Sequence, residues 1–433
     1  MSGAIAGWSA GVASIPFPVR IGTPLAGYIA RTGVAEGTLD ELIIGAIVLQ
    51  HEYTRFVLVA ADVVAIDASL AGEVAAAAGL ERAELALCAS HTHSGPAGVV
   101  ARLHPADVDR LDRNLRSRFI ATAAEAIATA RTGMEGVELL VGVAETEGIA
   151  ANRNDPLAPY DPRLTVLATR RGDDSLQGVI CHFACHPTIL GADNRLISAD
   201  FPGALREALN VALDRHGRAA VVLFVNGAAG DVSTRFTRRA QDAGEVSQVG
   251  SALATAAVQA LRNASPHTGP IRHGRTTVRL SRRSRRPIKS RVVAAGTGSD
   301  DEAPGCLSPA QIRVGETRAQ GAVLLESLAQ IPDTAIPYEL ELEAWALGDV
   351  VLVAVPGELF TSLGSRIGSA SAGMTLILGY TNGYVGYLTD ISAHESQTYE
   401  ALASPFDPEA GERVTDAATA LVERIRKQSR RAC

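Results

Sequence analysis

Five apolar segments of this 433-residue chain end abruptly in polar clusters, and this repeated pattern is the strongest constraint on its fold. The segments are LALCAS before His91, GVICHFAC before His186, AAVVLFVN before Asp231, VVLVAV before Glu358, and TLILGYTNGYVGYL, which contains Tyr387. Short apolar runs bounded by polar, glycine-bearing loops are typical of buried strands. Because open sheets bind ligands at the carboxyl ends of their strands, we expect these ends to form one shared site.

The periodicity of the rest of the chain predicts a mixed α/β fold. Amphipathic helices are predicted over residues 107–132, 202–216, 245–263 and 408–427. Strands are predicted over residues 54–63, 83–89, 137–143, 165–168, 178–185, 219–225, 339–346, 350–355 and 375–378. ATRRGDDSLQGV and EAWALGDVVLVAV are predicted hairpins. Helices alternate with strands early and hairpins dominate later, so we expect one large α/β domain over residues 1–433, with mixed sheets flanked by helices.

Composition excludes several classes of partner. The net charge of −7 argues against a nucleic-acid partner, which would need a basic face. No window approaches the roughly 20 consecutive apolar residues of a membrane span, so we expect no stable membrane insertion. The amino terminus lacks a charged region followed by an apolar core, and a cytoplasmic location is therefore expected. The sequence leaves the oligomeric state open.

The cysteines and one basic segment are expected to have structural roles. Cys181 and Cys185 are predicted to lie about 13 Å apart along a strand. That is too far for a disulfide, whose Cα atoms lie within about 7 Å, so the five cysteines are expected to be buried or free thiols. Residues 281–310 begin with several arginines from Arg282 to Arg291 and are predicted to be a charged, solvated insertion. The alternative is contact with an anionic substrate or a membrane surface.

Two histidine positions suggest metal chemistry. His91 and His93 are two residues apart, so in extended chain both rings point the same way. His186 ends another strand, and imidazole with carboxylate suits a zinc ion that keeps one position open for water. His182 lies about 13 Å from His186 along the strand and is predicted to be a packed or hydrogen-bonded residue. The other histidines are expected at the surface: His51, His104, His216, His267, His273 and His394.

Ser233 follows a strand in NGAAGDVS, but the G-x-S-x-G pattern of a nucleophile elbow is absent around it. The small residues before Asp231 would let the backbone approach a ligand closely. A tight strand-to-helix turn is the alternative interpretation of the same residues.

Six motifs in order resemble the catalytic domain of the neutral/alkaline (non-lysosomal) ceramidases, a family of zinc amidases. They are HTHSGPAG, ANRNDP, ACHPT, NGAAGDVS, AVPGELFT and TNGYVGYLTDISAHESQTYEA, and they span residues 91–401. PLAGY and AADVVAID near the amino terminus also fit. The resemblance implies the zinc ligands His91, His186, Glu358 and Tyr387. It also implies contacts to the scissile carbonyl from His93, Arg153 and Tyr399, and a catalytic or substrate-positioning role for Ser233.

The chain departs from the family pattern at several points. Thr234 and Arg235 follow the GDVS motif, NRSP becomes Asn152–Asp155, and neither a secretory signal nor a carboxyl-terminal β-sandwich is recognised. We therefore expect a small-molecule amide more soluble than long-chain ceramide. Arg235 and the basic segment favour a carboxylate on that substrate.

The expected function is a zinc-dependent hydrolase of linear carboxamides, N-acyl amines in the broad sense. Water bound to Zn2+, with its pKa lowered to about 7, would attack the amide carbonyl. The alternatives are a zinc-dependent ester or lactam hydrolase, and an acyltransferase or cyclase in a biosynthetic pathway. A non-catalytic binding protein on the same fold is a further alternative.

Overall fold

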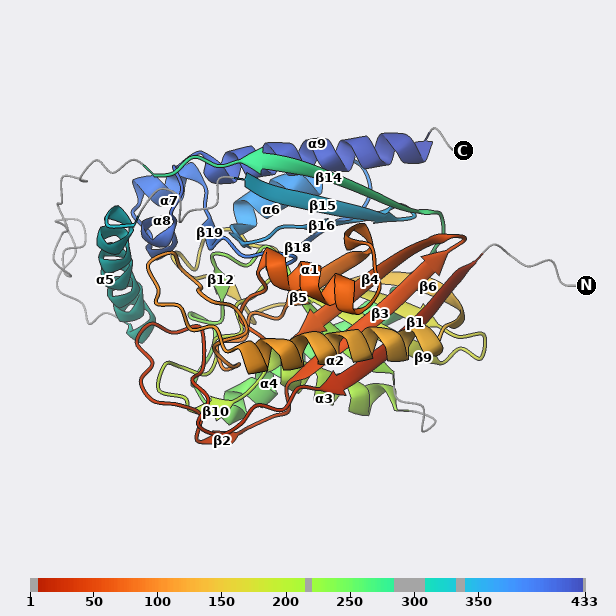
Figure 1. Ribbon diagram of the computed structural model, residues 1–433, viewed down its shortest axis with the longest axis horizontal. Coiled ribbons are helices and arrows are strands. Elements are labelled where there is room, and N and C mark those ends of the chain that lie inside the picture. The colour runs from red at the N-terminus through yellow and green to blue at the C-terminus, as the bar shows by residue number, and fades with distance from the viewer. Residues whose placement is uncertain (1–6, 215–219, 284–307, 332–338, 431–433) are drawn as a thin grey trace, which may run out of the picture.

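Two β-sheets lie face to face in this computed structural model, and helices cover the outer face of each sheet (Figure 1). The structure describes residues 7–214, 220–283, 308–331 and 339–430. Between the sheets, Leu58, Ile180 and Leu223 of the first pack with Trp345 and Leu352 of the second. The four layers confirm the predicted α/β class with mixed sheets flanked by helices.

Within the described residues, the first sheet has nine strands and mixed pairing. Its order is β11 (Val221–Asn226), β9 (Leu176–Phe183), β8 (Arg163–Arg170), β6 (Glu135–Glu145), β1 (Trp8–Pro16), β3 (Ile43–His51), β4 (Thr54–Ala61) and β5 (Leu85–Ala89), with β13 (Ser265–His267) also pairing with β6. The pairs β4–β5 and β9–β11 are parallel. Although β5 and β11 end this order, their carboxyl ends meet, because the Asn226 amide donates to the carbonyls of Ser90 (3.1 Å) and Cys185 (3.0 Å). Three strand ends therefore converge on one place.

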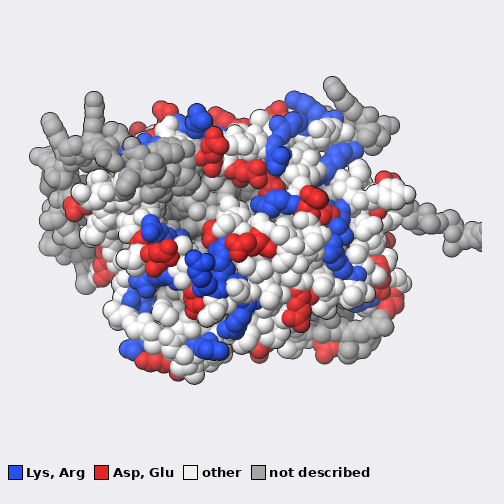
Figure 2. Space-filling model, viewed as in Figure 1, with Lys and Arg blue, Asp and Glu red and all other residues white. Residues whose placement is uncertain are grey.

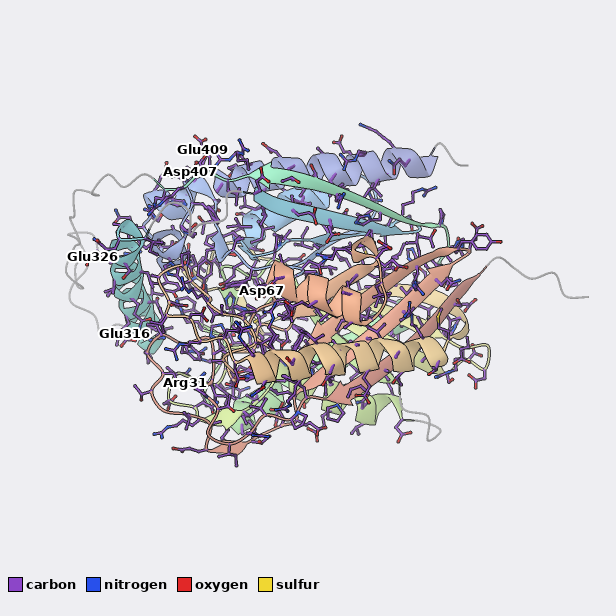
Figure 3. The ribbon with its side chains drawn as sticks, viewed as in Figure 1. Arg31, Asp67, Glu316, Glu326, Asp407 and Glu409 are labelled. Carbon is purple, nitrogen blue, oxygen red and sulfur yellow. The ribbon has the colours of Figure 1, made fainter. Side chains whose placement is uncertain are left out.

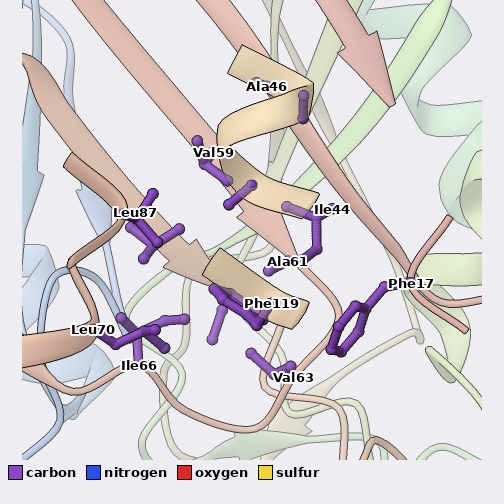
Figure 4. Close-up of a cluster of buried hydrophobic side chains, with 14 of the residues drawn as sticks. Phe17, Ile44, Ala46, Val59, Ala61, Val63, Ile66, Leu70, Leu87 and Phe119 are labelled. Atoms are coloured by element: carbon purple, nitrogen blue, oxygen red, sulfur yellow. The ribbon is translucent and has the colours of Figure 1, made fainter. Parts of the chain in front are cut away.

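Four helices cover the outer face of the first sheet. They are α1 (Ala68–Ala77), α2 (Arg113–Thr132), α3 (Phe201–Leu213) and α4 (Ala243–Arg262). In α2, buried residues three or four apart, such as Phe119, Ala123 and Ile127, form one apolar face. Figure 4 shows Phe119 with Val59 and Leu87 of the sheet in this core. The other face of the sheet is left to the second sheet.

The second sheet has the order β14 (Ile271–Arg279), β15 (Glu339–Leu347), β16 (Val350–Ala354) and β18 (Thr375–Leu378). Its outer face packs against α6 (Thr361–Ser369) and α9 (Ala410–Arg430). β16 and β18 are parallel, so the chain leaves both strands at the same edge. The segments that follow these two strands contribute the residues of the second sheet to the candidate site.

Short elements complete the region around the strand ends. The two-residue ladders are β2 (Gly37–Thr38) with β10 (Leu196–Ile197), β7 (Ala151–Asn152) with β12 (Val232–Ser233), and β17 (Glu358–Leu359) with β19 (Tyr387–Leu388). The remaining helices are the 3-10 helix η1 (Arg82–Glu84), α5 (Pro309–Ala329), α7 (Ile391–Glu395) and α8 (Tyr399–Ala403). Gly321 of α5 lies so close to the Tyr399 backbone that an added Cβ would sit 3.1 Å from its carbonyl oxygen. The helix α5 therefore packs directly on α8.

The predicted strands and helices are confirmed, with shifts of a few residues at their ends. The largest shift is in α2, which begins at 113 instead of 107 because the Asp112 side chain caps it by accepting from the N–H groups of Asn114 and Leu115. Both predicted hairpins are present. The elements that sequence analysis missed are β1, β3, β13, β14, η1, α1, α5, α6, α7 and α8 and the two-residue ladders.

Several residue-level predictions can also be compared with the structure. Cys88, Cys181 and Cys185 are buried free thiols, as predicted, while Cys306 and Cys433 lie outside the described residues. Most of the charged segment 281–310 also lies outside them. Within the described part of the chain, no helix combines the length and the apolar character that crossing a bilayer requires. Figure 2 shows acidic and basic side chains interspersed over the described part of one face.

Of the six histidines predicted at the surface, His216 lies outside the described residues, and the prediction is wrong for His51. His51 is buried and packs edge-on against Trp8, with ring centroids 5.1 Å apart. The other four are half-buried, and each ring has a hydrogen-bond partner. The sequence could not show these partners because most of them are distant in the chain, such as Asp349 for His267.

Candidate metal centre

His91 is presented by the loop that follows β5. Its φ of 68° lies in the left-handed region, which is uncommon for a residue with a side chain and is typical of functional positions. The ring stacks on Tyr380 at a centroid distance of 4.0 Å, and Nδ1 lies 2.6 Å from the Val64 carbonyl oxygen. A carbonyl only accepts, so Nδ1 carries the proton and Nε2 is the nitrogen left for another partner.

His186 follows β9 and is completely buried. Its Nδ1 lies 2.7 Å from the Ala229 carbonyl oxygen, which again places the proton on Nδ1. Burial, together with the nearby Arg153 guanidinium, lowers the pKa of His186 to about 4, so the ring is neutral at neutral pH. Ala229 lies just after β11, and the convergence of β9 with β11 therefore orients this ring.

Glu358 reaches the two imidazoles from the second sheet. Its Oε2 lies 2.9 Å from His186 Nε2 and 3.5 Å from His91 Nε2. Its Oε1 accepts a short hydrogen bond from the Tyr384 hydroxyl. Burial acts to raise the pKa of Glu358, but the imidazoles of His91 and His186 outweigh it and hold this pKa well below its usual value. The carboxylate is therefore ionised within a buried cluster.

These contacts place two ring nitrogens and a carboxylate around one point. In both rings a backbone carbonyl already lies at Nδ1, so both Nε2 atoms point at the Glu358 carboxylate. Positive charge between these groups, from a bound metal ion or from ring protons, would stabilise this arrangement. Two ligand atoms on a tetrahedral zinc ion lie about 3.3 Å apart, given bonds of about 2 Å. The separations of 2.9 and 3.5 Å fit such an ion.

His93 is the third imidazole of the cluster. Its Nε2 lies 3.2 Å from His91 Nε2, which confirms that the two rings converge. By geometry alone, His91, His93 and His186 could also hold an ion, because one ring nitrogen from each lies within 4.8 Å of the others. However, the buried Nδ1 of His93 has no hydrogen-bond partner among the described residues. Metal-binding histidines almost always anchor their second nitrogen, and only His91 and His186 do so here.

Arg153 and Tyr387 lie beside the cluster. Tyr387 is the direct partner of Glu358 in the β17–β19 ladder, so their side chains leave the ladder on the same side. The Arg153 guanidinium donates to the Tyr387 hydroxyl at 3.0 Å and to Glu400 Oε1 at 2.6 Å. Burial raises the pKa of Tyr387 well above its usual value, and the positive charge of Arg153 opposes that effect. Tyr387 is thus placed near the cluster, and its role as a ligand stays a prediction.

Tyr399 and Ser233 occupy different surroundings. The ring of Tyr399, the first residue of α8, lies edge-on to Tyr387 at a centroid distance of 5.7 Å. Ser233 forms a backbone bridge with His186, but its Oγ accepts from the backbone N–H of Arg235 at 3.2 Å. Among the described residues that line the cleft, Ser233 is not found, whereas Tyr399 is. The arrangement favours a structural role for Ser233 over nucleophilic attack.

A cleft of about 260 Å³ opens onto the cluster. His91, His93, Glu358, Tyr387 and Tyr399 form its polar part. Its apolar walls include Val63, Val64, Val99, Val100 and Leu103. A small group of polar side chains at the end of an apolar cleft is the usual form of a site for a small organic molecule.

Sequence analysis missed the segment that holds His93 in place. Gly27 has a φ of +98°, and a Cβ there would lie 2.4 Å from His93 Cγ. Tyr28 packs edge-on against the same ring, and Arg31 donates to the His93 carbonyl at 2.5 Å. The motif PLAGY contains the first two of these residues, so their presence was visible in the sequence while their task was not.

Two buried acids near the cluster were given no role by sequence analysis, although Asp231 was named there among the strand-end residues. Glu400 binds Arg153 and also accepts from the Asn154 amide at 3.0 Å. Asp231 accepts from the Asn152 amide and from the Thr361 backbone N–H, both at 2.7 Å, and burial raises its pKa to about 7. Glu400 directly follows the predicted Tyr399, which was the only signal for it in the sequence.

The fold and the site define an α/β protein with a buried histidine–carboxylate cluster at converging strand ends. Residues 11–286 match the family described as neutral/alkaline non-lysosomal ceramidase, N-terminal. The chain belongs to this family, as the sequence motifs predicted.

Relatives of known structure or curated identity support the same assignment. The chain is 24% identical over 400 residues to the neutral ceramidase of Pseudomonas aeruginosa, covering 78% of this chain and 59% of that protein. It is 24% identical over 385 residues to the neutral ceramidase of Mycobacterium tuberculosis, covering 74% and 60%. It thus spans about three-fifths of the length of these two relatives. The solved structure titled "Ceramidase complexed with C2" shares the fold, with a TM-score of 0.77, 18% identity, and coverage of 98% of this chain and 76% of that one.

Proposed function

We propose that this protein is a zinc-dependent amidohydrolase that cleaves the carboxamide bond of N-acyl amines. The observation that carries the proposal is the pair of buried imidazoles whose Nδ1 atoms face backbone carbonyls while both Nε2 atoms face the Glu358 carboxylate. Family membership supports amide hydrolysis, since the relatives are neutral ceramidases. Nitrogen and carboxylate donors at these separations suit zinc.

The proposed ligands are His91, His186, Glu358 and Tyr387. The first two are anchored through Nδ1, and the third through the Tyr384 hydroxyl. Such anchoring fixes the direction of each donor atom before the ion arrives. Tyr387 would complete the set from beside Glu358, with Arg153 stabilising its phenolate form.

A bound zinc ion supplies an activated water and polarises the amide carbonyl. The groups of the chain itself would do the rest. His93 borders the cleft and the ligands, where it can donate to the oxygen of the amide as negative charge develops on it. Tyr399 also faces the cleft and can donate a proton to the departing amine. The apolar walls near Val63 and Val99 would exclude water and hold the acyl part.

Arg153 would hold Tyr387 in position. Its guanidinium joins Tyr387, Glu400 and the Gly230 carbonyl, which come from three separate segments. Ser233 would support this arrangement through its backbone bridge to His186 and its bond to the Arg235 N–H. Neither residue is proposed as a nucleophile.

The test combines metal analysis with an activity screen. Protein purified without chelator should contain one zinc per chain and should hydrolyse N-acyl amines, while His91→Ala should lose both properties together. Hydrolysis of esters or lactams with no amide cleavage would move the assignment to an ester or lactam hydrolase. Amide formation from acid and amine without net hydrolysis would indicate an acyltransferase or cyclase. A folded protein with no metal and no turnover would indicate a binding protein.

A further inference from the structure

Four arginines from three segments gather beside the cleft, and we call them the arginine group: Arg31, Arg235, Arg238 and Arg313. Arg31 lines the cleft itself, Arg235 and Arg238 lie in the loop after β12, and Arg313 is on α5. Figure 3 shows Arg31 close to the end of α5 that carries Glu316, and Arg313 is one turn before Glu316. All four side chains are half-buried.

Contacts around Tyr28 bring two of these cations together. The Arg31 guanidinium lies 4.9 Å from the Tyr28 ring centroid, and the Thr188 carbonyl accepts from both the Tyr28 hydroxyl (3.5 Å) and Arg238 (3.0 Å). Burial, together with the positive charges of Arg153, Arg313 and Arg238, lowers the pKa of Arg235 to about 10, although Glu400 opposes this effect. Burial raises the pKa of Tyr28 to about 12, while Arg238, Arg31 and Arg313 oppose that rise. Tyr28 lines the cleft and packs against His93 at 4.9 Å, so the arginine group lies on the same side of the cleft as His93.

The arginine group has little compensating negative charge. Among the described residues, no carboxylate lies within ion-pair distance of Arg31, Arg235 or Arg238. Their guanidinium groups instead donate to backbone carbonyls, such as Arg235 to Arg153 at 2.9 Å and Arg238 to Thr188 at 3.0 Å. Arg313 contacts Glu316 at 3.1 Å.

Three acids influence this region electrostatically. Asp193 acts on Arg31 and is exposed to solvent, and the other two are engaged elsewhere. Glu400 is paired with Arg153 and bonded to Asn154. Asp200 accepts from the backbone N–H groups of Leu190 and Phe201. The region therefore holds more positive than negative charge within a partly desolvated space, which is unfavourable until an anion binds.

We infer that the substrate of the proposed amidohydrolase carries an oxyanion on its amine portion, a carboxylate or a phosphate, and that Arg235, Arg238 and Arg313 bind it. Guanidinium groups form strong, charge-assisted and often bidentate bonds with these anions. Arg235 is linked through Arg153 to Tyr387, and Tyr28 is linked to His93, so an anion there lies near both sides of the cluster. The inference rests on the proposed function and specifies its substrate class.

The basic segment that sequence analysis associated with a carboxylate contributes differently. Arg282 donates to the carbonyls of Leu328 and Ile331, and Arg283 donates to the Ala401 carbonyl. These two arginines hold the end of α5 and α8 in place. The rest of the segment lies outside the described residues, so the inference depends on the arginine group alone.

The experiment uses three amides that share a hexanoyl chain and differ only at the end of the amine. They are N-hexanoylglycine, N-hexanoyl-O-phosphoethanolamine and neutral N-hexanoylethanolamine. The zinc-loaded protein should show a kcat/KM at least tenfold higher for one of the charged amides than for the neutral one. Whether the carboxylate or the phosphate is preferred identifies the oxyanion. Raising the salt concentration should reduce the preference, because ions screen charge.

Variants then locate the site. Arg238→Gln and Arg313→Gln should each reduce the ratio of charged to neutral kcat/KM by at least threefold. Arg318→Gln, on an exposed arginine of the same helix, is the matched control and should leave the ratio unchanged. Arg313 is at the surface of α5, so its variant remains informative even if Arg238→Gln does not fold.

Two results would overturn the inference while leaving the proposed function intact. One is hydrolysis of the neutral amide as fast as the charged amides. The other is a charge preference that neither arginine variant reduces. If none of the three amides is hydrolysed, the proposed function fails. Calorimetry then tests the inference separately, because a charged amide should still bind at least tenfold more tightly than the neutral one.

Discussion

The two stacked sheets contribute opposite chemistries to the candidate metal centre. The first sheet presents His91 and His186 at its converging strand ends. The second presents Glu358 and Tyr387 from the short β17–β19 ladder beyond β16 and β18. Neither sheet alone holds both the imidazoles and the carboxylate. The site therefore exists only where the two layers are packed in register, so ion binding and the packing of the layers are coupled.

Other contacts between the layers do not involve the cluster. The Asn382 side chain pairs with the backbone of Leu87 and Leu85 and also donates to Glu343. The Trp345 indole donates to the Ala83 carbonyl at 2.7 Å, and His182 Nε2 lies 2.7 Å from the Ile377 carbonyl oxygen. The layers are thus joined by neutral hydrogen bonds and by the Arg82–Glu343 ion pair (2.9 Å), in addition to the histidine–carboxylate cluster. Variants can separate these two kinds of contact.

The largest effect is expected for Glu358→Ala, which removes the carboxylate of the second sheet. Zinc content and amidase activity should both fall to background, because the two remaining imidazoles cannot hold the ion alone. Zinc at a thousandfold excess over its Kd should stabilise wild type by about 4 kcal/mol. Wild type with saturating zinc should therefore melt at a higher temperature than the variant. With a chelator the two proteins should melt within a few degrees of each other. Stoichiometric zinc and full activity in the variant would refute the assignment.

His93→Ala tests whether the first sheet supplies two ligands or three. We expect retained zinc and a loss in kcat of about 10²-fold, the usual size for a lost oxyanion donor. The unanchored Nδ1 of His93 is the reason for placing it outside the ligand set. Loss of zinc from a folded His93→Ala variant, measured by elemental analysis, would show instead that the ion is held by the three histidines.

Arg153→Lys tests the contacts that join Arg153 to Tyr387 and Glu400. Lysine keeps the charge but cannot bind Tyr387 and Glu400 together, so kcat should fall about tenfold to a hundredfold with zinc retained. The matched control is Arg163→Lys, because Arg163 forms an exposed pair with Asp161. Unchanged kcat in Arg153→Lys would mean that charge alone is needed at this position.

Much of this arrangement could be predicted from the sequence because it depends on local patterns. Strand ends followed by polar residues identified His91, His186 and Glu358, and the i, i+2 spacing predicted the contact between His91 and His93. Apolar spacing located α2, α3, α4 and α9. These signals are all contained within a few consecutive residues.

The features that were missed depend on contacts between distant segments. Arg153 donates to Glu400, which is 247 positions away in the chain. Gly27 lies against His93 from a turn, and a turn has no sequence periodicity that would predict the contact. The apolar run of β3 was visible in the sequence but was not assigned, and in β1 small residues separate Trp8, Val12 and Ile15. The half-buried histidines show the same limit, because burial is decided by which elements pack over a loop.

Gly27→Ala should have a smaller effect, confined to the first-sheet side of the site. A Cβ at Gly27 would lie 2.4 Å from His93 Cγ, so the ring must move and kcat should fall several-fold, with zinc retained. The matched control is Gly22→Ala, since Gly22 has a similar φ of +91° but no atom within 4 Å of an added Cβ. Both variants share the backbone strain of about 1 kcal/mol, so only the effect on His93 differs. Equal activity of the two variants would argue against a positioning role for this segment.

The smallest effect on the reaction is expected for His182→Leu, which removes a contact between the layers away from the cluster. His182 lies four residues before His186 on the same strand segment, and its Nε2 lies 2.7 Å from the Ile377 carbonyl oxygen of β18. Leucine leaves that buried carbonyl unpaired, which should lower the free energy of unfolding by about 1–3 kcal/mol. Zinc content and kcat at 25 °C should match wild type, and His182→Gln, which can still donate, should recover part of the stability. A folded His182→Leu protein that loses zinc would show that the neutral contacts between the sheets and the charged cluster act as one unit.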